Sequence, residues 1–102
     1  MADNRRSATR HEVEIAARIQ IDGAQEPCQV RNLSMGGAYL GTRKLPMGSR
    51  VTLWFRIPTH ENEIEATGTV RWATDEGVGV QFDGLRARET WALGKYFESL
   101  PG

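Results

Sequence analysis

The sequence has very few residues of the kinds that bind metals or perform covalent catalysis. It contains one cysteine, Cys28, and two histidines, His11 and His60. A single cysteine excludes a disulfide within the chain and is typical of a reducing compartment. The clustered ligands of a zinc site are missing, and no motif places a histidine beside a nucleophilic serine. We therefore predict no catalytic residues, no metal site and no cofactor, and we expect that the protein is not an enzyme.

Net charge and long hydrophobic runs are also missing. The 13 basic residues balance the 13 acidic ones, so the formal net charge is zero. General binding to DNA requires an excess of positive charge. No apolar run reaches the length of a membrane span, and the first residues lack the apolar stretch of a secretory signal. These features favour a cytoplasmic protein with neither DNA nor a membrane as its partner.

Alternation of apolar and polar residues is the main structural signal in this chain of 102 residues. In residues 13–21 every second side chain is apolar, which is typical of a half-buried strand. Similar patterns predict strands around residues 28–30, 38–40, 51–57, 64–72 and 78–82, with Trp72 on the apolar face of the fifth. The alternation shifts phase near Asn32 and Leu33, which indicates a bend or bulge.

The period changes after Phe82. Apolar residues then recur at the spacing of one helix face, at Leu93, Tyr96, Phe97 and Leu100. Asp83 is a reasonable N-cap for this helix. We predict a mainly β fold, a six-stranded antiparallel β-barrel with a C-terminal amphipathic α-helix. Residues 1–11 are polar and without period, so we expect a flexible N-terminal arm ahead of one domain at residues 12–102.

Two short polar segments stand out from this pattern. Arg5, Arg6 and Arg10 crowd the first ten residues, either as a solvated basic tail or as an anion-binding arm. Arginine can bind a phosphate or the O6/N7 edge of guanine with two hydrogen bonds. The segment NLSMGG, residues 32–37, is either an ordinary turn or the rim of a binding site, where glycine lets a ligand approach the backbone.

The two segments together are more specific than either is alone. Residues 6–10 read RxxxR and residues 32–37 read NxSxxG. In this order, ahead of six predicted strands and a helix, they resemble the PilZ domain family. Residues 68–72, GTVRW, and 77–82, GVGVQF, look like the last two strands of that family. The resemblance extends over nearly the whole chain, from about Arg5 to Leu100.

This resemblance implies a cytoplasmic receptor for the bacterial second messenger cyclic di-GMP. By analogy with the family, Arg6 and Arg10 would hold guanine edges and phosphates of the ligand. The motif residues Asn32, Ser34 and Gly37 would contact the other guanine from the barrel surface.

Two further residues enter the implied site. Trp72 matches an aromatic position near the ligand in the family, although it also fits a plain core residue, and Arg5 could add a contact. We expect the arm to order on binding and to present a new surface to a separate, unidentified protein partner.

Two alternatives remain open. The protein could be a PilZ-like adaptor that contacts other proteins without binding a nucleotide. It could also be a small barrel that stacks single-stranded nucleic acid on Trp54 and Trp72. The zero net charge counts against this last alternative, because such grooves are basic.

Overall fold

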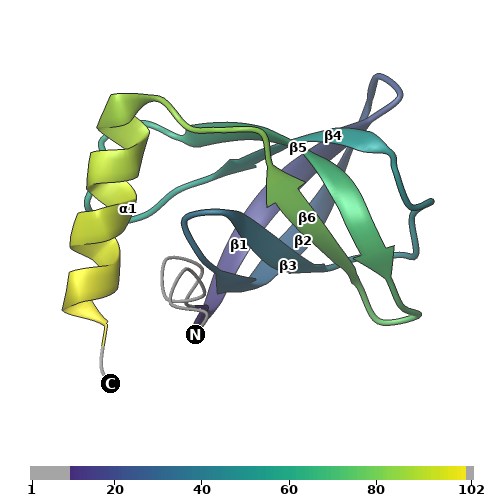
Figure 1. The fold of residues 1–102 in the computed structure, drawn as a ribbon, viewed down its shortest axis with the longest axis horizontal. Helices are drawn as coiled ribbons and strands as arrows, with labels where there is room; N and C mark the ends of the chain where they lie inside the picture. The colour runs from purple at the N-terminus through teal and green to yellow at the C-terminus, as the bar shows by residue number, and fades with distance from the viewer. Residues whose placement is uncertain (1–9, 101–102) are drawn as a thin grey trace, which may run out of the picture.

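The computed structural model describes residues 10–100, which fold into a closed antiparallel barrel and one helix (Figure 1). The strands are β1 (His11–Ile21), β2 (Ala24–Leu33), β3 (Gly37–Gly41), β4 (Arg50–Phe55), β5 (Ile64–Ala73) and β6 (Val78–Phe82), and α1 spans Ala87–Ser99. The predicted fold class is therefore confirmed for the described residues. Arg5, Arg6 and the rest of the predicted arm before Arg10 lie outside them.

The barrel closes because β1 pairs with strands on both of its sides. The order around the barrel is β1-β2-β3-β6-β5-β4. Ile19 of β1 lies opposite Glu26 of β2 on one side and opposite Leu53 of β4 on the other. Closure removes the exposed strand edges that would otherwise favour aggregation.

Alternating side chains from all six strands fill the interior of the barrel. The fully buried large side chains are Ile19, Val30, Leu33, Leu40, Leu45, Leu53, Phe55, Ile64, Val70, Val78 and Leu93. Each such side chain stabilises the fold by about 1.5–3 kcal/mol relative to an exposed position. Leu93 is the only one of them from α1, so the helix shares the core of the barrel and covers one end of it (Figure 1).

The start of the helix differs from the prediction. Asp83 is not the N-cap, because the helix begins at Ala87 after an N-cap at Arg86. A carboxylate oxygen of Glu89, one turn into the helix, accepts a hydrogen bond from the backbone N–H of Arg86 at 3.3 Å. Asp83 instead accepts hydrogen bonds from Arg50 and Thr67 on the barrel surface. The predicted apolar face of the helix is confirmed at Leu93, Tyr96 and Phe97, which pack on the core, whereas Leu100 follows the helix as its C-cap.

The predicted irregularity in the second strand is also confirmed. The pairing of β2 with β3 shifts register between Val30 and Asn32. A similar shift occurs where β5 pairs with β6, between Val70 and Trp72. Register shifts of this kind turn side chains toward a different face of the sheet, and both of these lie next to the candidate site.

No helix among residues 10–100 is long and apolar enough to span a membrane.

Candidate functional site

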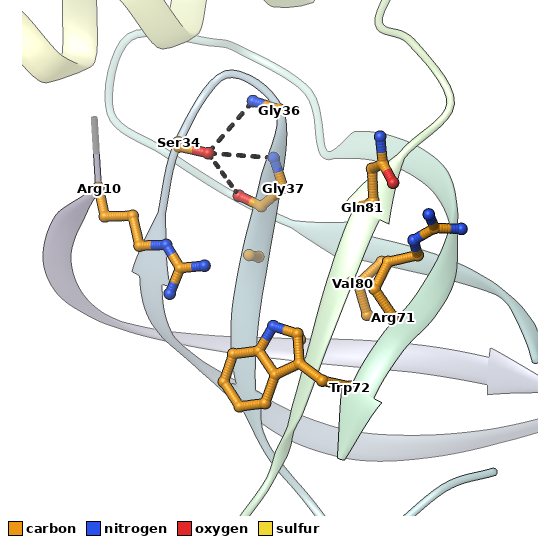
Figure 2. Close-up of a pocket in the computed structure, with 10 residues that line it drawn as sticks. Arg10, Ser34, Gly36, Gly37, Arg71, Trp72, Val80 and Gln81 are labelled. Carbon is orange, nitrogen blue, oxygen red and sulfur yellow. Dashed lines mark hydrogen bonds between the residues drawn. The ribbon is translucent and has the colours of Figure 1, made fainter. Parts of the chain in front are cut away.

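A pocket of about 370 Å³ lies on the outer surface of the barrel, where the chain before β1 meets the turn between β2 and β3. The end of β5 and the middle of β6 complete it (Figure 2). It is lined by Arg10, Ser34, Gly36, Gly37, Ala38, Arg71, Trp72, Gly79, Val80 and Gln81. No carboxylate is among these residues, so the charged groups of this lining are guanidinium groups.

The turn at residues 34–37 is held by a backbone hydrogen bond, from the N–H of Ser34 to the carbonyl oxygen of Gly37 at 2.9 Å, and by the hydroxyl group of Ser34. Ser34 Oγ accepts hydrogen bonds from the backbone N–H groups of Gly36 at 3.2 Å and Gly37 at 3.1 Å, and donates one to the carbonyl oxygen of Gly37. Figure 2 shows these three bonds converging on Ser34. The side chain is only 6% exposed. Because its hydrogen-bonding capacity is used within the turn, Ser34 shapes the rim of the pocket through the backbone.

The two glycines of this turn have different surroundings. A Cβ added at Gly37 would lie 2.3 Å from the carbonyl oxygen of Val80, so a side chain there would push β3 and β6 apart. A Cβ added at Gly36 would meet no atom within 4 Å. Gly37 is thus required by strand packing, and Gly36 leaves open space along the pocket.

Trp72 lies on the outer surface instead of the buried face, which corrects the sequence prediction. Its side chain is 38% exposed, whereas Val70, two residues earlier, is buried. The register shift in β5 places Trp72 opposite Gly79. The indole ring covers Gly79 so closely that a Cβ there would lie 2.2 Å from the ring nitrogen. The ring also stacks on Tyr39, with ring centroids 5.1 Å apart and an interplanar angle of 10°.

Two arginines flank this aromatic surface. Arg10 and Arg71 lie on opposite sides of the pocket in Figure 2, with Trp72 below them and Gln81 beside Arg71. Arg10 and Arg71 are both exposed. This arrangement offers positive charge, a flat ring and an amide to a ligand that carries negative charge and an aromatic group.

Asn32 lies in a neighbouring pocket of about 570 Å³ that is also lined by Glu12, Val13, Glu14, Arg31 and Tyr39. Within residues 10–100, Oδ1 of Asn32 is a buried side-chain oxygen with no hydrogen-bond partner. Tyr39 lines this second pocket and stacks on Trp72, which lines the first. The Tyr39–Trp72 pair therefore separates two adjoining hollows.

The predicted site residues are thus only partly brought together. Arg10, Ser34, Gly37 and Trp72 line one pocket, and Asn32 lies in the next one. Sequence reasoning missed six lining residues, which are Gly36, Ala38, Arg71, Gly79, Val80 and Gln81. No sequence signal identified Arg71, because the register shift that exposes it depends on how β5 pairs with β6.

Neither histidine lies in the main pocket. The ring of His11 stacks on Phe97 of α1 with centroids 4.2 Å apart, and His60 lines a separate hollow beside the start of that helix. Burial, with a smaller contribution from Glu26, raises the pKa of the Cys28 thiol to about 11, which keeps it protonated and unreactive. Within residues 10–100, no three histidine, cysteine or acidic side chains are grouped as metal ligands.

Comparison with protein families identifies a relationship over most of the chain. A family model described as PilZ domain matches residues 4–99. No curated protein matches the sequence.

Solved structures share the fold at low sequence identity. The PilZ domain of CeSA from a cellulose-synthesizing bacterium is 16% identical with a TM-score of 0.71, over 89% of this chain and 97% of that one. The Bacillus subtilis inhibitor of motility, MotI/DgrA, is 15% identical with a TM-score of 0.73, over 92% of this chain. The Borreliella burgdorferi PlzA protein in complex with c-di-GMP is 22% identical with a TM-score of 0.64, over 95% of this chain. The chain spans 52% of the motility inhibitor and 37% of PlzA.

Proposed function

The chain belongs to the PilZ domain family, and on this premise we propose that it is a receptor for cyclic di-GMP. The ligand is a dianion with two guanine bases, so it offers two phosphates, flat ring faces and acceptor-rich base edges. One of the structural neighbours, PlzA, was solved in complex with this ligand. The proposal makes the protein a binding module that acts without catalysis.

The observation that carries the proposal is that Arg10, Trp72 and the turn at residues 34–37 line one pocket. A guanine can stack on the exposed indole, and base–aromatic stacking contributes about 1–3 kcal/mol. The planar guanidinium of Arg10 can bind a phosphate or the O6/N7 edge of guanine with two hydrogen bonds. The lining contains no carboxylate that would repel the phosphates.

The motif residues outside this pocket complete the proposed contacts. Oδ1 of Asn32 is a buried acceptor without a partner among the described residues, and a guanine N–H donor would satisfy it. Arg5 and Arg6 precede Arg10 by a few residues, so we propose that they close over the ligand from the same segment. Closing this segment costs conformational entropy, which moderates the affinity.

We further propose that the bound state signals to a separate protein. Two residues next to the site lie close to α1. His11, which follows Arg10, stacks on Phe97, and Met35 of the motif turn lies so near Gly94 that a Cβ added to this glycine would be 3.5 Å from Cε of Met35. On the helix, Trp91 is 63% exposed, which is a feature of protein-contact surfaces. The exposed Trp91 also fits the alternative, an adaptor that contacts a protein without nucleotide.

Isothermal titration with cyclic di-GMP tests the proposal. We expect the wild-type protein to bind and the Arg10→Ala variant to lose about 5- to 150-fold in affinity, since one bidentate arginine–guanine contact contributes about 1–3 kcal/mol. Arg88→Ala is the matched control, because Arg88 is exposed on α1 and lines a different hollow. No binding by the folded wild-type protein would favour the adaptor function.

A further inference from the structure

The register shift between β5 and β6 determines the position of Arg71. Val70 pairs with Val80 and Trp72 pairs with Gly79, so Arg71 is an extra residue with no partner in β6. In a regular strand, consecutive side chains point to opposite faces of the sheet. Here Arg71 and Trp72 are both exposed and both line the same pocket. A bulge that re-aims a side chain in this way is common beside binding sites.

Arg71 differs from three other arginines of the barrel surface, because Arg18, Arg43 and Arg50 each form an ion pair with a carboxylate, at 2.6–2.7 Å. Arg71 forms no such pair with a carboxylate of residues 10–100. Arg31 of β2 forms no such pair among the described residues either, but it lines the second pocket together with Glu12 and Glu14. Arg71 lines the first pocket together with Gln81 and Trp72, which carry no charge. In Figure 2 its guanidinium group extends on the side of Gln81, away from the indole.

We infer that Arg71 determines the specificity for guanine by binding the O6/N7 edge of the base that stacks on Trp72. This inference rests on the proposed function and assigns a role to a residue outside the two sequence motifs. Guanine presents two acceptors on that edge, whereas adenine presents one acceptor and one N–H donor. An arginine fork can satisfy both acceptors of guanine, and it opposes its own donors to the amino group of adenine.

A base edge suits this position better than a phosphate does. The backbone N–H groups of Gly36 and Gly37, which could cradle a phosphate at this rim, already donate to Ser34 Oγ. The indole beside Arg71 supplies a flat surface, so a stacked base would present its edge to the residues around the ring. Gln81 adds a second group that can hydrogen-bond to a base edge.

The test compares cyclic di-GMP with cyclic di-AMP, which have the same phosphates and differ in the base edge. Affinities are measured by displacement of labelled cyclic di-GMP from the wild-type protein and from Arg71→Ala and Arg71→Lys variants, with circular dichroism as the check of folding. Lysine keeps the charge but lacks the fork. We expect both variants to weaken cyclic di-GMP binding by about 5- to 150-fold. Cyclic di-AMP binding should stay unchanged or become tighter, because the donors that oppose the adenine amino group are removed or moved. The Arg88→Ala control should alter neither affinity.

The outcomes separate this inference from the proposed function. Equal loss of both dinucleotides in Arg71→Ala, with recovery in Arg71→Lys, would mean a phosphate contact and would overturn the specificity role. Unchanged binding of cyclic di-GMP in both variants would overturn any role of Arg71. If the wild-type protein binds neither dinucleotide, the proposed function fails together with this inference.

Discussion

Alanine at Gly37 and alanine at Gly36 should have opposite consequences, although the two glycines are adjacent. A Cβ at Gly37 would lie 2.3 Å from the carbonyl oxygen of Val80, and real Cβ atoms essentially never approach closer than 3.0 Å. The strands must therefore separate by at least 3.0 − 2.3 = 0.7 Å at this point. Overpacking of this kind costs about 1–3 kcal/mol. For a domain of this size the melting temperature should then fall by about 4–24 °C.

Gly36→Ala is the matched control for this substitution. Nothing lies within 4 Å of the added methyl group, and Gly36 is not among the residues with positive φ. The free energy of unfolding should stay the same or rise by up to about 1 kcal/mol, because alanine restricts the unfolded chain. The methyl group adds to the lining of the pocket, so the affinity for cyclic di-GMP should fall.

Urea unfolding followed by tryptophan fluorescence measures the first effect, and calorimetric titration at a temperature where both variants are folded measures the second. Gly37→Ala should lower the urea midpoint without changing the slope of the transition. A Gly37→Ala midpoint equal to that of the wild-type protein would refute the close approach of β3 and β6. In that case the glycine would serve ligand access, as the sequence first suggested.

Three further predictions follow from the same geometry. Ser34→Ala should weaken ligand binding and lower the free energy of unfolding by about 0.5–1.5 kcal/mol, because backbone N–H groups of the turn lose their acceptor. Thr74→Ala should lower the free energy of unfolding by a similar amount in urea unfolding but leave ligand affinity in calorimetric titrations unchanged. Equal ligand affinity of the two variants would contradict this prediction. Gly79→Ala should displace the ring of Trp72, change the near-ultraviolet circular dichroism and weaken binding; an unaltered spectrum would mean that the ring does not cover the glycine. The Cys28 thiol should react slowly with a disulfide reagent at pH 8 in the native protein and quickly in urea. Rapid labelling of the native thiol would contradict its burial. The pKa of this thiol in the folded protein, about 11, exceeds the ordinary 9.0, so the thiol's contribution to stability is complete below pH 9 and is lost as the pH rises toward 11.

The barrel could be predicted from the sequence because its strands are half-buried. Alternation of apolar and polar residues fixes which face of each strand points inward, and the core of the structure follows that pattern. The helix could be predicted from its apolar spacing, but its first residue could not. Asp83 has the chemistry of an N-cap, yet it lies on the barrel surface and pairs with Arg50, a residue 33 positions earlier in the chain. The local sequence around Asp83 cannot predict this ion pair, because only the tertiary fold brings Arg50 close to it.

The pocket was harder to predict because its geometry depends on a register shift. Strict alternation along β5 places Trp72 inward with Val70, and the structure reverses this by inserting Arg71. Bulges arise from how two strands pair, so one strand's sequence rarely identifies them. The same shift accounts for the missed Arg71, since an exposed arginine on a strand has no signal of its own.

The serine and the last glycine of the motif NxSxxG fix the backbone of a turn, and other residues around this turn make it a binding site. Thr74 and Gly77 reproduce the hydrogen bonds of Ser34 and Gly37, with a hydroxyl that accepts from two backbone N–H groups and donates to the glycine carbonyl. That second turn joins β5 to β6 at the other end of the β3–β6 pair and lines neither of the two pockets described above. A hydroxyl and a glycine at this spacing therefore specify a turn, and the turn by itself specifies no ligand. What distinguishes the first turn is that Arg10, from the chain before β1, and the bulged end of β5 lie against it. Substitutions in the turn should thus change ligand affinity by altering the backbone shape of the pocket rim. Substitutions of the surrounding arginines and of Trp72 should change ligand affinity by removing direct contacts with the ligand.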